Sequence, residues 1–282
     1  MSDKTIYCRW SPTLGALEDT AEKIWGTPEY EGDRDEPAVF FGLYGFPDFY
    51  TLWRHRGKKW ILWAGSDIVH FRNGYWLEEG GGIKIDADQL SPWINKYCEN
   101  WCENEVERQA LEDVGIQAQV CPSFLGDIEE FEEEFKRNDR PKVYLSASPG
   151  REAEYGWKLI EEIAPLCNVD FYLYGSPDWE SPHHNVFSRG RVPKEQMNDE
   201  VKNMQCGLRL NEFDGFSEIT AKSILWGQYP IVWSTFQYPG IESFSNKEEL
   251  IKLLNELKDK VLPNPKRAFY RRELNQFPWN TK

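Results

Sequence analysis

The fold of this chain is indicated most clearly by residues 208–232, which read LRLNEFDGFSEITAKSILWGQYPIV. The leading apolar run predicts a strand, Ser217 has the side chain of a helix N-cap, and Gly227 is placed to end that helix. Pro230 and the apolar residues after it then begin a second strand. The stretch therefore predicts the strand, helix and strand of a parallel sheet.

This unit is suited to an anionic ligand. Ligands of open parallel sheets gather at the carboxyl ends of the strands, and the start of a helix offers unpaired N–H groups to a phosphate. A tight turn at Asp214-Gly215 brings the chain to such a place just before the helix. We therefore expect an anion near Gly215–Glu218.

The alternation of strands and helices extends over the whole chain. Short β-rich runs predict strands over residues 5–9, 38–42, 59–63, 117–121, 142–147, 170–174, 207–210 and 229–233. Helical patterns between them cover residues 17–25, 48–56, 103–114, 154–166, 194–204, 218–226 and 247–257. This rhythm is typical of α/β layers with parallel strands.

Two domains are expected, because 282 residues suffice for two cores and the alternation of strands and helices is interrupted once. Residues 126–140 lie in an acidic stretch before Pro141 and predict a linker or a solvated connecting helix. The N-terminal domain is then 1–125 and the C-terminal domain 141–263. Residues 264–282 predict a terminal helix that docks, since its aromatic side chains would be costly in solvent.

Charge excludes some functions. The formal net charge is −14, which argues against general binding of nucleic acid, although a small basic patch stays possible. Aromatic residues make up 15 % of the chain, and they suit cores as well as sugar or base sites. No window of 18 apolar residues and no apolar signal region at the N-terminus are present, so we expect a cytoplasmic protein without a membrane span.

No metal or cofactor is expected. Cys98 and Cys102 are four residues apart on an expected helix or its approach, which suits buried small side chains better than half a zinc site. Asp86-Ala87-Asp88 has the DxD spacing of metal-dependent sugar transferases, but the residues after it predict a helix start, so capping is the better interpretation. The three glycines at 80–82 lack the pattern of a phosphate-binding loop.

Residues 208–232 resemble the nucleotide-sugar half of GT-B glycosyltransferases. Asp214-Gly215-Phe216-Ser217 matches the family's Glu-Gly-Phe-Gly, and residues 227–232 match its Gly-x-Pro-Val-Val. The likeness extends back over residues 143–156, 171–175 and 185–193. Residues 11–15 and 60–68 resemble the acceptor domain more loosely.

The resemblance implies two Rossmann-like domains facing a cleft, with the C-terminal helix crossing back to the first domain. It also implies metal-independent transfer of a sugar from a nucleotide-sugar donor to the hydroxyl of an unknown acceptor bound mainly by residues 1–125. The catalytic candidates are Asp67 and Asp214. The donor-binding candidates are Gly15, Ser148, Arg151, Gly175, Arg191, Val192, Gly215, Phe216, Ser217, Glu218 and Lys222.

Several of these roles have structural alternatives. Lys222 stands where the family has a second glutamate, and it either holds a phosphate or pairs with Glu218 one turn earlier. Asp67 either orients an acceptor hydroxyl or caps the next segment through backbone N–H groups. Arg151 and Arg191 are candidates for the diphosphate or simply solvated, and Tyr155 replaces the family's lysine.

Other functions stay open at this point. A nucleotide-sugar epimerase has the same architecture, and a viral-type enzyme that glycosylates DNA bases is conceivable despite the net charge. The lysine at 222 also permits a catalytically silent nucleotide- or sugar-binding module. The donor base, the sugar, the acceptor, the stereochemistry and the oligomeric state are not predicted.

Overall fold

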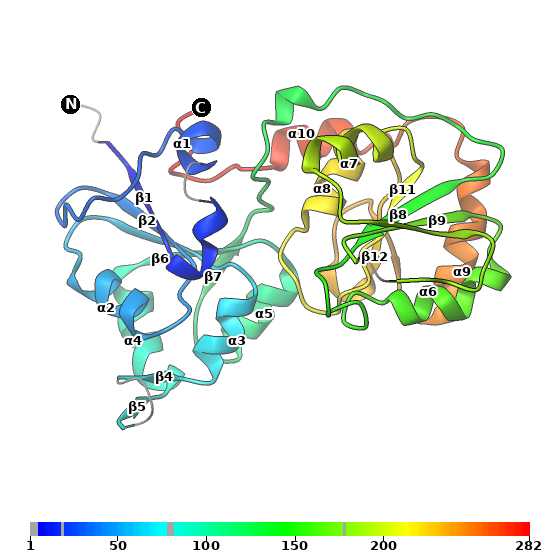
Figure 1. The fold of residues 1–282 in the computed structure, drawn as a ribbon. Helices are drawn as coiled ribbons and strands as arrows, with labels where there is room; N and C mark the ends of the chain where they lie inside the picture. Colours follow the sequence, from blue (N-terminus) through cyan, green and yellow to red (C-terminus); the bar gives the residue numbers. More distant parts are fainter. Residues whose placement is uncertain (1–4, 18–19, 78–81, 177–178) are drawn as a thin grey trace. The chain divides into compact units, whose positions relative to one another are not determined.

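The computed structural model describes residues 5–17, 20–77, 82–176 and 179–282. The chain divides into two compact units (Figure 1). Unit 1 comprises Met1–Asp127, Phe213–Phe216 and Glu273–Lys282, and unit 2 comprises Ile128–Glu212 and Ser217–Arg272. The short segment Phe213–Phe216 therefore belongs to unit 1, although the residues on both sides of it belong to unit 2.

Unit 1 is built on a parallel sheet whose strands follow one another in the order β1-β2-β3-β6-β7. These strands are β1 (Tyr7–Trp10), β2 (Ala38–Phe41), β3 (Lys59–Leu62), β6 (Glu99–Cys102) and β7 (Ala118–Val120). The helices of this unit are η1 (Pro12–Leu17), α1 (Thr20–Trp25), α2 (Phe46–Arg54), α3 (Ser66–Arg72), α4 (Ala87–Tyr97) and α5 (Glu105–Glu112). An antiparallel pair, β4 (Tyr75–Trp76) and β5 (Lys84–Ile85), lies between α3 and α4.

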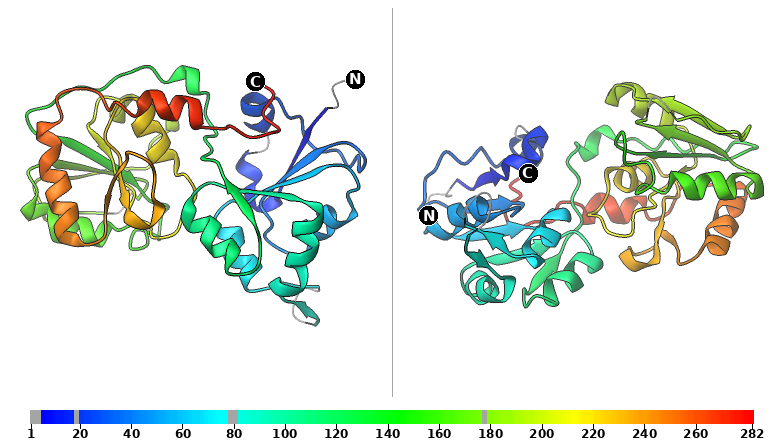
Figure 2. Two further views of the ribbon diagram at one scale, coloured as in Figure 1. Left: turned by 180° about the vertical axis from the view of Figure 1, so that it is seen from behind. Right: turned by 60° about the horizontal axis from the view of Figure 1, so that its bottom comes forward.

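Both faces of this sheet are covered by other parts of the unit. Successive side chains along a strand point to opposite faces, so each strand contributes to two cores. Phe40, Ile61 and Trp63 share a core with side chains of α2 to α5. The residues between them pack against α1 and the C-terminal tail, where Phe277 and Trp279 are buried. Figure 1, and Figure 2 from behind, show α2 to α5 on one side of the sheet and α1 with the C-terminus on the other.

Unit 2 holds a parallel sheet of the order β10-β9-β8-β11, which the bridge between Leu208 and Ile231 extends to the parallel pair β12 and β13. Its strands are β8 (Lys142–Ser146), β9 (Asp170–Tyr174), β10 (Val186–Gly190), β11 (Cys206–Gly207), β12 (Ile231–Trp233) and β13 (Glu242–Phe244). In chain order this is 3-2-1-4-5-6, the order of a dinucleotide-binding sheet. The order reverses between β8 and β11, and ligands of such sheets bind outside the carboxyl ends of the strands at this switch point.

The α-helices of unit 2 are α6 (Trp157–Ile163), α7 (Lys194–Val201), α8 (Glu218–Leu225), α9 (Lys247–Glu256) and α10 (Arg267–Glu273). Its single-turn 3₁₀ helices are η2 (Ile128–Glu130), η3 (Ala164–Leu166), η4 (Ser234–Phe236) and η5 (Leu257–Asp259). The core of the unit is formed by strand residues such as Val143, Phe171 and Leu173 against Trp157 and Ile160 of α6. The expected α/β architecture with parallel sheets is confirmed.

Three local expectations are wrong. Cys98 follows α4 and Cys102 lies in β6, so the two cysteines share no helix and a fourth parallel strand was missed, although both side chains are buried as expected. The expected helix over residues 264–282 is confined to α10, because Asn275 adopts a left-handed backbone conformation and Pro278 follows. The helices α3 and α4 were not predicted in full, although the capping of α4 by Asp86 is confirmed, with Gln89 Oε1 accepting from Asp86 N at 2.9 Å.

The acidic stretch before Pro141 contains one short helix, η2. Its Phe131 side chain is buried against Trp226, with ring centroids 5.1 Å apart. Arg267 and Arg271 of α10 donate hydrogen bonds to the Phe131 carbonyl at 2.8 and 3.1 Å. Part of this stretch is therefore fastened to unit 2 rather than solvated.

Candidate functional site

The carboxyl edge of the unit 2 sheet, meaning the edge at which its parallel strands end, brings together several predicted donor-binding residues. Ser148 follows β8, Gly175 follows β9, and Arg191 follows β10. Gly175 N donates to Gly190 O at 2.7 Å, and a Cβ on Gly175 would lie 1.9 Å from Ala147 O. Because Gly175 also has φ +108°, only glycine fits this close approach of the loops.

Two arginines flank one tyrosine at the switch point of this sheet. The Arg151 guanidinium lies 5.5 Å from the centre of the Tyr155 ring, and that of Arg209 lies 4.6 Å from it. Arg151 also pairs with Glu154 at 2.6 Å. Arg209 follows β11, so the loops after β8 and β11 both carry a cation here. Arg209 was missed in the sequence, although its place after an apolar strand was a usable signal.

The start of α8 is capped as expected. Ser217 Oγ accepts from Thr220 N at 3.2 Å and hydrogen-bonds to Thr220 Oγ1 at 2.8 Å. The helix ends before Gly227, whose φ of +84° confirms its expected role in ending α8. The local signals of capping therefore placed this helix correctly.

Lys222 pairs with Glu218, which is one of the two alternatives for it. Its Nζ lies 2.9 Å from Glu218 Oε1 and donates to Asn198 Oδ1 at 2.9 Å, while Lys194 reaches the same Glu218 oxygen at 3.1 Å. Burial lowers the pKa of Lys222, and Glu218 opposes that change. Burial alone would raise the pKa of Glu218, but Lys222 and Lys194 hold it below its usual range. Glu218 is therefore an ionised carboxylate between two ammonium groups.

Asp67 lies at the carboxyl edge of the unit 1 sheet and is fully buried. Its Oδ2 accepts from Leu43 N and its Oδ1 accepts from Ala64 N, both at 2.9 Å. Burial raises its pKa to about 7, against the opposing effect of these N–H groups. The side chain thus joins the loops after β2 and β3, which favours the capping alternative over contact with an acceptor.

A second buried carboxylate, Glu103, holds the segment that contains Asp214. Glu103 Oε2 accepts from Phe216 N at 2.9 Å, and Ser123 Oγ donates to its other oxygen. The neighbouring Asn104 donates through Nδ2 to Asp214 O at 2.7 Å. A Cβ on Gly215 would lie 1.8 Å from Glu103 Oε2, so a larger residue there would displace the Glu103 carboxyl group. Gly215 and Phe216 are therefore held within unit 1, whereas Ser217, Glu218 and Lys222 lie in unit 2.

Glu103 is joined by Glu107 one turn later. Glu107 Oε2 accepts from Glu103 N at 2.7 Å, while its buried Oε1 has no hydrogen-bond partner among the described residues. Burial raises the pKa of Glu103 to about 8, and burial together with Glu103 raises the pKa of Glu107 well above its usual range. The role of these two residues was not predicted, because Glu103 was assigned to a helix rather than to the end of a strand.

The remaining donor-binding candidates lie in a short helix and in a loop. Gly15 lies within η1, after β1. Arg191 is exposed and Val192 half-buried in the loop between β10 and α7. Their contacts with a donor stay predictions.

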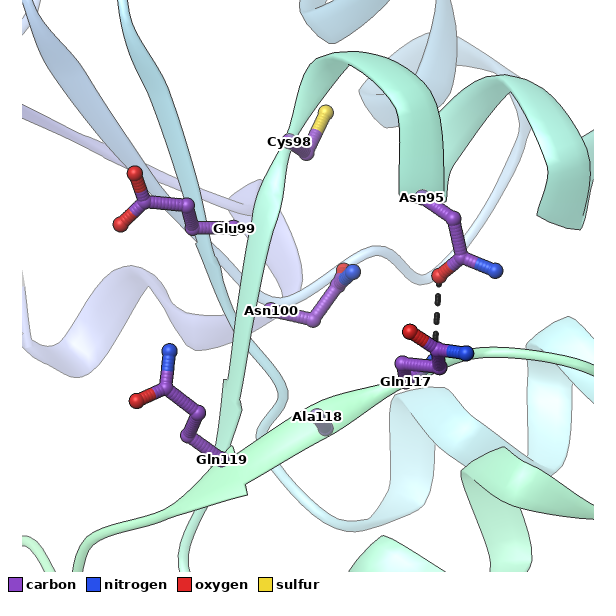
Figure 3. A pocket seen from close by; sticks show the side chains of 7 residues that line it. All are labelled: Asn95, Cys98, Glu99, Asn100, Gln117, Ala118 and Gln119. Carbon is purple, nitrogen blue, oxygen red and sulfur yellow. Dashed lines mark hydrogen bonds between the residues drawn. The ribbon is translucent and has the colours of Figure 1, made fainter.

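A polar pocket of about 270 Å³ lies at the opposite, amino edge of the unit 1 sheet (Figure 3). Asn95 Oδ1 accepts from Gln117 N at 3.0 Å, and Asn95 Nδ2 donates to Gly115 O at 2.6 Å. Glu99 accepts from the indole of Trp60 and pairs with Lys58. These polar groups thus fasten the ends of β6 and β7 to neighbouring elements.

The described residues contain neither a metal-binding cluster nor a membrane-spanning helix. No group of three or more His, Cys, Asp or Glu side chains there is arranged to hold a metal ion. Within the same part of the chain, no helix is long and apolar enough to cross a membrane.

The fold is similar to that of solved GT-B glycosyltransferases. Lipopolysaccharide outer core galactosyltransferase WaaB matches with a TM-score of 0.61 and 11 % identity, over 96 % of this chain and 96 % of WaaB. Anabaena HepE, solved with UDP and glucose, matches with a TM-score of 0.56 and 10 % identity, over 93 % of this chain and 77 % of HepE. The expected GT-B fold is thereby confirmed.

A third match covers less of its counterpart. S. aureus TarM, in a complex that contains UDP, has a TM-score of 0.56 and 12 % identity, over 84 % of this chain and 51 % of TarM. The chain thus spans about half the length of TarM. No family model matches the sequence, and no curated protein is similar to it at a significant level.

Proposed function

We propose that this protein transfers a sugar from a nucleotide-sugar donor to an acceptor hydroxyl. The observation that carries the proposal is the pair Arg151 and Arg209 at the switch point of unit 2, in a sheet of the order that binds nucleotides. A guanidinium binds two phosphate oxygens at once, and a charge-assisted hydrogen bond of this kind is stronger than a neutral one. The GT-B fold supports the same function.

The leaving group of this reaction is a nucleoside diphosphate. As the bond to the sugar breaks, negative charge grows on the diphosphate, and cations fixed beside it stabilise the transition state. Arg151 and Arg209 would supply this charge where the family's lysine is replaced by Tyr155. We therefore propose that transfer needs no metal ion, so that a chelator leaves the rate unchanged.

The Asp214–Ser217 segment would contact the donor sugar. The Asp214 carboxylate would accept hydrogen bonds from sugar hydroxyls, while the network around Glu103 and Asn104 holds its backbone in place. Ser148, Gly175, Arg191 and Val192 would lie around the base and ribose. The acceptor would bind to unit 1, where Asp67 joins the loops after β2 and β3. Gly15 stays a donor-binding candidate.

A nucleotide-binding module without transferase activity is the second candidate. Lys222 stands where the family has a carboxylate, and its ammonium group is already engaged with Glu218 and Asn198. An ammonium group cannot accept a hydrogen bond from a sugar hydroxyl. This observation favours a module that binds a donor but does not turn it over.

Thermal unfolding with a panel of nucleoside diphosphates and their sugars tests the proposal first. UDP and UDP-sugars lead the panel, because two of the similar structures contain UDP. A ligand that binds only the folded state raises the unfolding temperature in proportion to RT ln(1 + [L]/Kd). Stabilisation by one base supports the proposal, and no stabilisation by any member at millimolar concentration contradicts it.

Donor consumption then separates the two candidates. A transferase releases the nucleoside diphosphate with an acceptor, or slowly with water, whereas a silent module binds the donor and releases nothing. Lys222→Glu is the matching variant, since it restores the carboxylate. A gain in turnover with Lys222→Glu would favour the silent module, and a loss would give Lys222 a specific role in the transferase.

A further inference from the structure

Two rows of apolar side chains, most of them aromatic, line a pocket between the helices α2 and α4 of unit 1. Phe46, Phe49, Tyr50 and Trp53 are spaced i, i+3, i+4 and i+7 along α2 and therefore share one side of it. Leu90 and Trp93 are spaced i and i+3 along α4. Between the rows lies a pocket of about 350 Å³ that these six side chains line.

Large aromatic side chains on the rim of the pocket are exposed to solvent. Tyr50 is 42 % exposed, Trp53 is 53 % exposed and Tyr97, one turn after Trp93, is 48 % exposed. Ring contacts join these side chains, with centroids 6.0 Å apart for Tyr50 and Trp53, 5.6 Å for Phe49 and Trp93, and 5.3 Å for Trp93 and Tyr97. A contiguous exposed patch of this kind marks an interaction surface.

Cations lie on the rim of this patch. Arg54 lies 5.3 Å from the centre of the Tyr50 ring, and Lys96 lies 5.0 Å from that of Tyr97. Neither has an ion pair with any described carboxylate, whereas the neighbouring Arg56 and Lys58 are paired with Asp35 and Glu99. This aromatic face therefore carries local positive charge in a chain of net charge −14.

The lining decides what kind of occupant fits. The six lining side chains are aromatic or aliphatic, so a hydroxylated ligand such as a sugar would lose hydrogen bonds to water and find few polar groups to replace them. Hydrocarbon suffers no such loss. Tryptophan and tyrosine are the side chains that settle at the boundary of a bilayer, and arginine and lysine beside them attract anionic headgroups.

We propose that the α2–α4 face, meaning Phe46, Phe49, Tyr50, Trp53, Leu90 and Trp93 with the rim cations Arg54 and Lys96, docks on the surface of an anionic phospholipid bilayer. Trp53 and Tyr50 enter the interface, the pocket takes part of an acyl chain, and the cations contact headgroup phosphates. The docking does not depend on the proposed sugar transfer.

Sedimentation with vesicles tests the proposal. We expect the protein to bind vesicles of phosphatidylcholine and phosphatidylglycerol in equal amounts, and to bind pure phosphatidylcholine more weakly. Arg54→Glu/Lys96→Glu should weaken binding to the anionic vesicles about tenfold or more, since each cation near such a surface contributes about 1 kcal/mol. Tyr50→Ala/Trp53→Ala should weaken binding to both kinds of vesicle. All four side chains are exposed or on the rim, so the unfolding temperature should stay close to that of the wild type.

The matched control is Lys158→Glu/Lys258→Glu, which changes the net charge equally at exposed positions of unit 2. It should bind anionic vesicles much more tightly than Arg54→Glu/Lys96→Glu does. Absence of wild-type binding would overturn the proposal, and so would equal binding by the two charge variants. Self-association that Tyr50→Ala/Trp53→Ala abolishes, without vesicle binding, would show an interface between copies instead.

Discussion

The two sheets end at carboxyl edges of opposite chemistry. In unit 1 the side chains there are buried carboxylates, Asp67, Glu103 and Glu107, whose oxygens bind backbone N–H groups of nearby loops. In unit 2 they are cations, among them Arg151 and Arg209. One architecture thus serves two tasks. The first edge holds its loops through buried carboxyl groups, whereas the second carries cations suited to attract an anion.

Substitution of a glycine at the carboxyl edge of the unit 2 sheet is expected to have the largest effect on stability. Gly175→Ala would place a Cβ 1.9 Å from the Ala147 carbonyl at φ +108°, whereas Gly150→Ala at φ +80° meets nothing within 4 Å. We expect Gly175→Ala to lower the free energy of unfolding by about 3 kcal/mol or more, and Gly150→Ala by about 1 kcal/mol. Urea unfolding checks both, and equal losses would show that the loops at this edge are not closely packed.

The buried carboxylates of unit 1 make stability depend on pH. The folded state raises the pKa of Glu103 to about 8, above its ordinary 4.5, so the stabilisation is full below about pH 4.5 and is lost as the pH rises through about 8. Glu103→Gln should reduce the loss of unfolding free energy between about pH 5 and about pH 8 by on the order of 2 kcal/mol. Asp67 and Glu107 shift in the same direction, so some dependence stays.

Denaturant unfolding across this pH range provides the measurement for Glu103→Gln. Glu112→Gln, an exposed change at the end of the helix α5 that follows Glu103, is the control and should leave the slope as it is in the wild type. An unchanged slope in Glu103→Gln would mean that Glu103 is ionised in the folded protein near neutral pH, and would contradict the raised pKa of this group.

Lys222 and Lys194 of unit 2 both pair with Glu218 but differ in burial. The Lys222 side chain is 10 % exposed, whereas that of Lys194 is 60 % exposed. Glu218 is itself half exposed, so solvent screens the pair, and we expect Lys222→Met to cost about 1 kcal/mol of stability and Lys194→Met less than about 0.5 kcal/mol. Thermal unfolding of the two variants measures this, and a larger loss in Lys194→Met would reverse the assignment.

Local signals in the sequence predicted much of unit 2. The N-cap Ser217 and the terminating Gly227 act within a few residues, so they fix α8 without help from the rest of the fold. The strands β8 and β9 are apolar runs buried in a parallel sheet, and their position needed only composition. Such features are determined by neighbours in the chain.

The parts that were missed depend on distant residues. The strand β6 has two polar residues among four and lacks the pattern of a strand, so its place beside β3 and β7 follows only from tertiary pairing. Glu103 gains its role from Phe216, 113 residues later. Arg209 meets Tyr155 only because the strand order reverses between β8 and β11. Sequence spacing contains none of these contacts.

The central claim is that the cations at the switch point of unit 2 bind a diphosphate. Calorimetric titration of a nucleoside and its diphosphate, for the base that stabilises the protein most, tests this most directly. We expect the diphosphate to bind at least about tenfold more tightly than the nucleoside, because a hydrogen bond to a charged group contributes about 1.5–3 kcal/mol, and Arg151→Ala/Arg209→Ala to abolish that gain. Equal affinity for the two ligands, or a gain that survives in the double variant, would contradict the account.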